Sequence, residues 1–137
     1  MDKENRKQHD EWNHFKKILD SINIDVPFFD GEIWSIAIGT NIDIEINGKG
    51  QNFERPVIII KKFSKRHAWI IPLSRVENIK NGIHVPVYHK KLYLHSVAMI
   101  TQLQRTSNSR FLYKIGILDE NQLLKIKKVI INHLNTK

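Results

Sequence analysis

Three short apolar runs in the first half of the chain restrict its fold more than any other feature. They are rich in Ile, Val and Trp, and each ends at a Gly, Pro or basic turn; they cover residues 32–38, 55–62 and 68–73. Runs of this length and composition are typical of β-strands. The middle run has four consecutive branched apolar residues, 57–60, which predicts a strand buried on both faces.

Two further strands are predicted later in the chain. Residues 84–88 form a short run that contains Pro86, and proline predicts an edge position because it has no N–H to donate to a neighbouring strand. Residues 92–103 contain the apolar segment 97–100, which predicts a buried strand. Several short strands at close spacing, flanked by helices, favour a small curled β-sheet or barrel over a parallel α/β fold.

Helices are predicted near both ends of the chain. Residues 10–22 carry apolar side chains at helical spacing between charged ones, which is typical of an amphipathic helix. The chain beyond residue 103 is helical in character. Asp119 and Gln122 have the spacing of a capping box at the start of a terminal helix, whose apolar stripe is Leu123, Ile126, Ile130 and Leu134.

The polar loop at residues 40–54 has no apolar periodicity, and loops of this length in compact domains are usually functional or disordered. Arg55 follows it directly and precedes the rigid Pro56. Most arginines in such a place are plain surface cations, but a guanidinium held at a loop mouth is well suited to a phosphate group. Ser74 ends the third run, where it is either a turn residue or a hydroxyl donor to phosphate. We expect the loop, Arg55 and Ser74 to form a site for RNA.

The amino-acid composition limits which classes of function the chain can have. The chain has 137 residues, a formal charge of +8 and a pI near 9.8, which favours polyanionic partners but also supports solubility alone. It has no cysteine, so disulfides, thiolate zinc sites and cysteine nucleophiles are excluded, in keeping with a reducing cytoplasm. No signal peptide or membrane-length apolar run is present, and no phosphate-binding glycine motif or metal-type histidine pair appears. We therefore expect a soluble cytoplasmic protein without metal or cofactor.

A basic turn joins the second and third runs. Its cations lie close to an aromatic side chain, and this combination has two interpretations that the sequence leaves open. Charge and stacking together suit single-stranded nucleic acid, whereas a charge run of this length is also common in a solvated turn. The residues are Lys61, Lys62, Lys65, Arg66 and Trp69.

Histidines are scattered through the predicted strands and turns without the spacing of catalytic partners. We interpret them as structural, with His84 and His95 the best placed for acid–base chemistry if any histidine performs it. The other two in this region are His67 and His89.

Several segments, taken together in order and spacing, resemble the MazF/PemK toxins of bacterial toxin–antitoxin systems. They are residues 31–34, the loop from Thr40 to Gly50, 54–58, and Ile71-Pro72-Leu73-Ser74. The resemblance continues to the terminal helix and covers about residues 30–131. We therefore predict an N-terminal helical extension at 1–29 and a MazF/PemK-like domain at 30–137.

That resemblance implies an SH3-like barrel of the CcdB/PemK/MazF type that forms a homodimer and is inhibited by a small antitoxin protein. The activity it implies is a metal-independent endoribonuclease that cuts single-stranded RNA at short sequences. In the family scheme the 2′-hydroxyl attacks the adjacent phosphorus and leaves a 2′,3′-cyclic phosphate and a 5′-hydroxyl. Metal ions and other cofactors have no part in this scheme.

Matching the family motifs residue by residue implies catalytic roles for Arg55 and Ser74. Arg55 would stabilise the charged phosphorane and take part in proton transfer, and Ser74 would hydrogen-bond the scissile phosphate. Glu45, Lys49 and Gln102 match positions that touch RNA or shape its groove.

The chain departs from the family pattern at two places. Many relatives have threonine where Ser74 stands, and the hydroxyl is retained. Near Gln102 an arginine found in many relatives lies one residue later, at Arg105, which in a strand would move it to the other face. Two alternative functions share the fold: a gyrase-binding toxin of the CcdB type, which lacks the Arg-Pro and Pro-Leu-Ser pair, and an inactive module that binds only an antitoxin.

Overall fold

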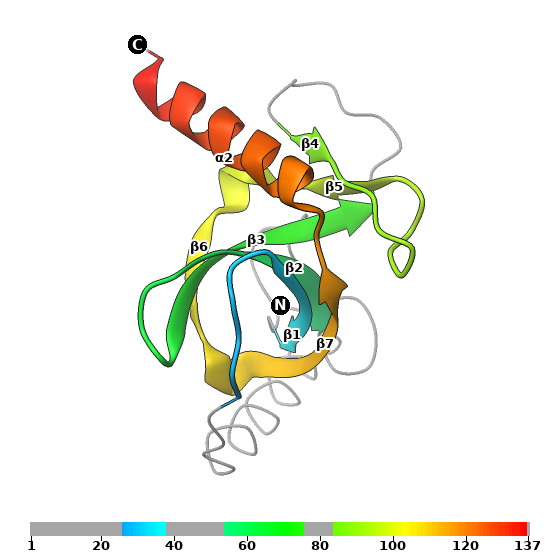
Figure 1. The fold of residues 1–137 in the computed structure, drawn as a ribbon, viewed down its shortest axis with the longest axis vertical. Helices are drawn as coiled ribbons and strands as arrows, with labels where there is room; N and C mark the ends of the chain where they lie inside the picture. Colours follow the sequence, from blue (N-terminus) through cyan, green and yellow to red (C-terminus); the bar gives the residue numbers. More distant parts are fainter. Residues whose placement is uncertain (1–25, 38–53, 76–83, 137) are drawn as a thin grey trace, which may run out of the picture.

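The computed structural model describes residues 26–37, 54–75 and 84–136, and shows seven strands and a terminal helix in these segments (Figure 1). The long strands are β1 (Glu32–Ala37), β2 (Glu54–Lys62), β3 (His67–Arg75) and β7 (Phe111–Ile117). The short strands are β4 (Val85–Pro86), β5 (Ser96–Ala98) and β6 (Gln104–Ser107). Two 3-10 turns, η2 (Ile100–Gln102) and η3 (Asn108–Arg110), flank β6, and α2 (Glu120–Asn135) ends the described chain.

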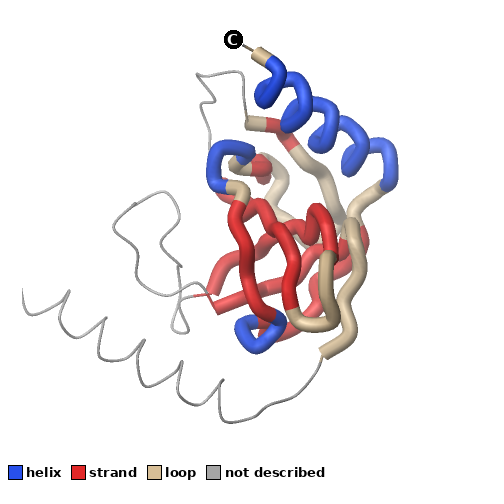
Figure 2. Tube along the Cα trace, turned by 90° about the vertical axis from the view of Figure 1, so that its left-hand side faces the viewer, coloured by secondary structure: helices blue, strands red, loops and turns tan. Residues whose placement is uncertain are grey.

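All described strand pairs are antiparallel and belong to one seven-stranded sheet. The order is β4-β5-β3-β2-β1-β7, and β6 pairs with β3 beyond β5. The sheet curls strongly, and α2 lies across one end of it (Figures 1 and 2). The mainly β fold with a C-terminal helix is therefore confirmed, as is the edge position of the strand that contains Pro86.

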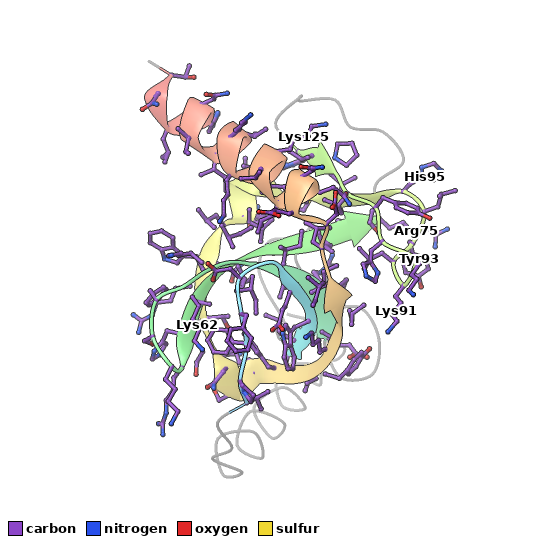
Figure 3. The ribbon with its side chains drawn as sticks, viewed as in Figure 1. Lys62, Arg75, Lys91, Tyr93, His95 and Lys125 are labelled. Carbon is purple, nitrogen blue, oxygen red and sulfur yellow. The ribbon has the colours of Figure 1, made fainter. Side chains whose placement is uncertain are left out.

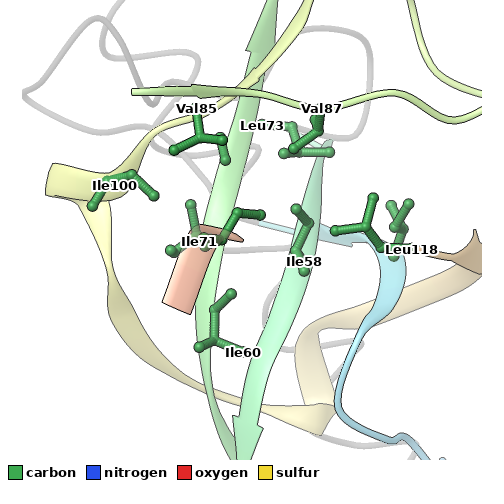
Figure 4. Close-up of a cluster of buried hydrophobic side chains, with 11 residues drawn as sticks. Ile58, Ile60, Ile71, Leu73, Val85, Val87, Ile100 and Leu118 are labelled. Carbon is green, nitrogen blue, oxygen red and sulfur yellow. The ribbon is translucent and has the colours of Figure 1, made fainter. Parts of the chain in front are cut away.

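The core consists of two clusters, one on each face of β2, and residues of that strand alternate between them. Ile58 and Ile60 belong to the cluster that also contains Leu118, which lies just before α2. Figure 4 shows this cluster in close-up. Val57 and Ile59 belong to the other cluster. Because successive side chains of a strand point to opposite faces, a strand between two clusters must be apolar throughout. The predicted burial of β2 on both faces is confirmed.

The segment just before β1 packs into the second cluster. Phe28 is fully buried, and its ring meets that of Phe111 edge-on with centroids 5.1 Å apart. The Asn108 side-chain amide donates to the Val26 carbonyl at 3.3 Å. Phe28, with Val26 packed against the same cluster, thus contributes to the core. The predicted helix at 10–22 lies outside the described residues, and the division of the chain at residue 30 stays a prediction.

Two predictions for the second half of the chain are wrong. The strand predicted at 92–103 is limited to β5, because the chain then turns on local hydrogen bonds: Gln102 N–H donates to the Met99 carbonyl and Leu103 N–H to that of Ile100. The helical character predicted after residue 103 is replaced by β6 and β7. These segments pair with β3 and β1, and pairing with a sheet outweighs weak local propensity.

Helix α2 begins directly after Asp119, as predicted, but the capping box does not form. The Asp119 side chain makes no capping hydrogen bond. Gln122 instead accepts from the Tyr88 N–H at 2.7 Å and donates to the Tyr88 carbonyl at 2.9 Å. The Gln122 side-chain amide thereby satisfies both the N–H and the carbonyl of Tyr88, which follows β4. Within the described residues, no helix is long and apolar enough to cross a membrane.

Candidate active site

A cavity of about 580 Å³ opens where β2 begins and β3 ends. The first residues of β2, the last of β3, the turn at 90–93 and two residues of β7 line it. Arg55 and Ser74, the two residues that the sequence predicts to be catalytic, are both in this lining. The structure therefore brings together residues 19 positions apart on neighbouring strands.

Arg55 is nearly fully buried, with 5% of its surface exposed. Its Nη1 donates to the Leu73 carbonyl at 3.2 Å, which ties the guanidinium to the end of β3. Burial lowers the pKa of Arg55 from its ordinary value, because the charged form loses hydration. The side chain is thus fixed in place and poorly solvated, which strengthens its interaction with any anion that enters the cavity.

Ser74 is held by pairing with β5 on one side and lies next to β2 on the other. It pairs with Val97 of β5, and the register that pairs Val57 with Pro72 places Ser74 across from Arg55 when it is continued by two residues. Ser74 is partly exposed at the cavity. A hydroxyl in this position can donate a hydrogen bond to a ligand that the guanidinium also contacts.

Further cations surround the cavity. Arg75 follows Ser74, and Lys90 and Lys91 come from the turn before β5. The Arg75 guanidinium lies 4.9 Å from the centre of the Tyr93 ring, and both belong to the lining (Figure 3). Together with Arg55 these residues give a local positive field, which suits a phosphate-bearing ligand.

Glu54 is the one carboxylate among the described residues of the lining. Ser35, which is buried in β1, donates to its Oε2 at 2.7 Å. The carboxylate is therefore oriented by a neighbouring strand beside the buried Arg55. Glu54 lies within one of the family motifs, but the sequence predicts no role for it or for Lys90, Lys91 and Tyr93. The available signal was a pair of lysines followed closely by an aromatic residue.

The turn that carries the two lysines is held from behind. Gln122 of α2 binds the Tyr88 backbone, as described above. His89 packs on Gly116 of β7 so closely that a Cβ at Gly116 would lie 2.6 Å from His89 Nε2. A larger residue at this position would push the His89 ring away from β7.

The remaining predicted residues lie elsewhere. Gln102, in η2, and Arg105, on β6, do not belong to the lining of the cavity. Glu45 and Lys49 lie outside the described residues. His84 and His95 do not line the cavity either, and no histidine does so within the described segments. In those same segments, no group of three or more His, Asp or Glu side chains is arranged to hold a metal ion.

The sequence matches one protein-family model over residues 30–134, nearly the whole of the described fold. That model is of the PemK-like, MazF-like toxins of type II toxin–antitoxin systems. The chain belongs to this family. A comparison with curated proteins gives no significant match.

Solved MazF-family structures share the fold at low sequence identity. An endoribonuclease from a mycobacterial species, in complex with its cognate antitoxin, has a TM-score of 0.59 and 10% identity over 80% of this chain and 97% of its own. The MazE–MazF complex of Deinococcus radiodurans gives 0.58 and 9%, covering 82% and 100%. The Mycobacterium tuberculosis toxin MazF-mt6 gives 0.52 and 19%, covering 68% and 98%. At these identities the likeness concerns the fold, which is the MazF fold.

Proposed function

We propose that this MazF/PemK-family protein is the toxin of a type II toxin–antitoxin pair and a metal-independent, sequence-specific endoribonuclease that cleaves single-stranded mRNA in the cytoplasm. One observation carries the proposal: the buried Arg55 guanidinium and the Ser74 hydroxyl are positioned at one cationic cavity. Membership of the family and its endoribonuclease structures support it.

The reaction is an internal phosphoryl transfer. The 2′-oxygen bonds to the adjacent phosphorus, the bond from phosphorus to the 5′-oxygen breaks, and the products end in a 2′,3′-cyclic phosphate and a 5′-hydroxyl. Because the nucleophile belongs to the substrate, the protein contributes orientation and charge stabilisation rather than a nucleophile of its own.

Arg55 and Ser74 act on the phosphorane oxygens in this proposal. Both donate to the non-bridging oxygens, where negative charge develops, and fixed donors in a dry site stabilise that charge most. The proton of the 2′-hydroxyl passes to the Glu54 carboxylate, which Ser35 orients. The leaving 5′-oxygen takes a proton from Arg55 in this proposal, as the family scheme implies.

The outer residues of the cavity bind the rest of the strand. Lys90 and Lys91 neutralise flanking phosphates, and the exposed rings of Tyr93 and Tyr113 offer faces on which unpaired bases stack. A duplex keeps its bases stacked inside, so this arrangement selects single-stranded RNA. Gln102, which does not line the cavity, and Glu45 and Lys49 remain proposed contacts to RNA or to its groove.

We further propose that the protein forms a homodimer and is neutralised by a cognate antitoxin. The support is an apolar surface of α2 that remains exposed in the single chain, with Leu124, Ile131 and Leu134 at 49%, 55% and 77% exposure. Two of the structures with this fold contain an antitoxin or MazE chain.

The decisive experiment incubates purified protein with a long single-stranded RNA in excess EDTA and identifies the product ends. We expect cuts at one short recurring sequence, with 2′,3′-cyclic phosphate ends. Arg55→Ala should reduce cleavage by at least about 100-fold, the scale of losing a donor to the developing charge, with an unchanged circular dichroism spectrum. If the RNA stays intact with folded, antitoxin-free protein, the protein is a binding module and not an enzyme. Full activity of Arg55→Ala would overturn the mechanism.

A further inference from the structure

A second surface of interest lies at the turn between β2 and β3. The antiparallel register pairs Lys61 with Trp69, and Trp69 in turn with Arg105 of β6. Residues directly opposite each other in a sheet project from the same face. A cation, an indole ring and a second cation therefore stand in one row across three strands, and all three are exposed.

Two further rings extend this row toward the turn. The Phe63 ring lies parallel to the His67 ring, with centroids 6.3 Å apart and an angle of 12°. It meets Trp69 edge-on at 5.9 Å. Phe63 and Trp69 remain 47% and 50% exposed although they contact each other. We name Lys61, Phe63, His67, Trp69 and Arg105 the hairpin platform.

The backbone of the turn holds these rings in place. The N–H groups of Phe63 and Ser64 both donate to the His67 carbonyl, at 3.2 and 3.3 Å. Ser64 Oγ accepts from the N–H groups of Arg66 and His67, at 3.3 and 3.0 Å. On the opposite side of the sheet, Ala68 is fully buried, so β3 cannot rotate its exposed face inward. A rigid set of exposed rings loses little entropy when a flat ligand stacks on it.

The charge around the platform is almost entirely positive. Residues 61–67 contain Lys61, Lys62, Lys65 and Arg66 and no acid. Asp30 approaches Lys61 at 3.9 Å, but that lysine side chain is still 60% exposed, and a surface pair of this length contributes little. Aromatic faces interleaved with cations match the alternation of base and phosphate in a single nucleic-acid strand.

The platform is distinct from the cavity of the candidate active site. Lys61 lies six residues from Arg55 along β2, and six residues of extended strand span roughly 20 Å. In Figure 3, Lys62 beside the hairpin lies on one side of the molecule, and Lys91 and Tyr93 of the cavity lie on the other. The residues of the platform do not line the cavity.

We propose that the hairpin platform is a second binding site for single-stranded RNA, remote from the cleavage site. Bases stack on Trp69 and Phe63, and Lys61 and Arg105 contact the flanking phosphates. The inference rests on the proposed function only in its choice of RNA as the ligand. Its role is to hold a long transcript near the cavity, so it affects the binding of long RNA and leaves the chemistry at Arg55 unchanged.

The test measures fluorescence anisotropy of a labelled 20-nucleotide RNA with 2′-O-methyl groups, which cannot be cleaved by 2′-hydroxyl attack. Trp69→Ala should raise the Kd about 10-fold, the scale of one lost base–aromatic stack, and Trp69→Phe should restore most of the affinity. Lys61→Ala with Arg105→Ala should reduce the slope of log Kd against log salt by about 1.4, which corresponds to two phosphates of a single strand.

A charge-matched control removes two exposed lysines of α2, Lys125 and Lys128, and should leave both Kd and slope unchanged. A Kd and slope equal to wild type in the Trp69 and Lys61/Arg105 variants would overturn the proposal, as would loss of antitoxin binding with RNA binding intact. Cleavage of a short oligonucleotide provides the separate readout of the active site. If wild type does not cleave the short oligonucleotide but Trp69→Ala still raises the Kd for the labelled RNA, the proposed endoribonuclease activity is wrong and the proposed RNA site at the platform is supported.

Discussion

At the scale of single residues, the site depends on buried side chains whose hydrogen bonds come from other strands. Arg55 is tied to Leu73 and Glu54 to Ser35, at 3.2 and 2.7 Å. Outside the cavity, the buried Glu32 carboxylate accepts from Lys114 of β7 and from Trp34 and Phe29, which are near it in the sequence. Removing a partner would leave a poorly solvated polar group without a hydrogen bond, which costs free energy, so each group depends on its particular partner.

Ser74 tests whether the hydroxyl matters as a donor. Ser74→Ala should lower kcat by about 100-fold with little change in stability, because it removes one hydrogen bond to the developing charge. Ser74→Thr keeps the hydroxyl and should retain activity near that of the wild type. Single-turnover cleavage with end analysis measures both variants. Equal rates for Ser74→Ala and wild type would remove Ser74 from the mechanism.

Glu32 gives a prediction about pH. Burial alone would raise the pKa of its carboxyl, but hydrogen bonds from Lys114, Trp34 and Phe29, with the charge of Lys114, outweigh burial and lower it. The folded state therefore binds this proton less readily than the unfolded chain. Its contribution to stability is present above the ordinary pKa of glutamate, about 4.3, and is lost as pH falls through the lower folded value.

Urea unfolding between pH 7 and pH 3 measures this effect. Wild type should lose stability toward the acid end, and Glu32→Gln should be less stable at pH 7 but show a shallower loss. The reason is that the amide has no charge to lose. Parallel curves for the two proteins would show that Glu32 does not contribute to acid unfolding.

At the scale of elements, β7 and α2 hold the turn at residues 90–93 against the cavity. Gln122 replaces its expected capping role with two hydrogen bonds to Tyr88, and Gly116 leaves room for His89. Two elements other than the strands of Arg55 and Ser74 thus decide where Lys90 and Lys91 lie.

Gly116→Ala should displace the turn, since its new Cβ would lie within 2.6 Å of the His89 ring. We expect kcat/KM for RNA to fall about 10-fold, the scale of misplaced binding groups, with a small change in melting temperature because the ring can move. Adding His89→Ala removes the clash and should recover part of the loss. A double variant no better than Gly116→Ala would contradict this account.

At the scale of the whole molecule, the chain carries a formal charge of +8. Four cations line the cavity, at Arg55, Arg75, Lys90 and Lys91. Long-range attraction of a polyanion should therefore govern how quickly the protein finds its substrate.

The salt dependence of cleavage measures that attraction. Below saturation, log(kcat/KM) should fall linearly with log salt, with a slope of about −2 or steeper if three or more phosphates are neutralised at about 0.7 each. Lys90→Ala with Lys91→Ala should make the slope shallower by about 1.4. A rate independent of salt would mean that these cations do not contact the RNA backbone.

The local sequence determined those elements whose pattern of apolar residues can be recognised within a single segment. The unbroken apolar run of β2 requires a core on both faces, and Pro86 requires an edge. Of the stripe predicted on α2, Leu123, Ile126 and Ile130 pack on the core, whereas Leu134 is 77% exposed. The order of the family motifs likewise predicted that Arg55 and Ser74 belong together. These features depend on periodicity and chemistry that adjacent residues carry themselves.

Only the tertiary structure decided the rest. Residues 104–107 and 111–117 are strands because β3 and β1 offer edges on which they pair, and the periodicity of these segments does not predict that. Glu54, Lys90 and Lys91 meet at one cavity, and Lys61, Trp69 and Arg105 form one row, because the sheet curls and its register brings distant residues together. Sequence sets what each segment can pair with, and the free energy of the packed sheet selects which pairing forms.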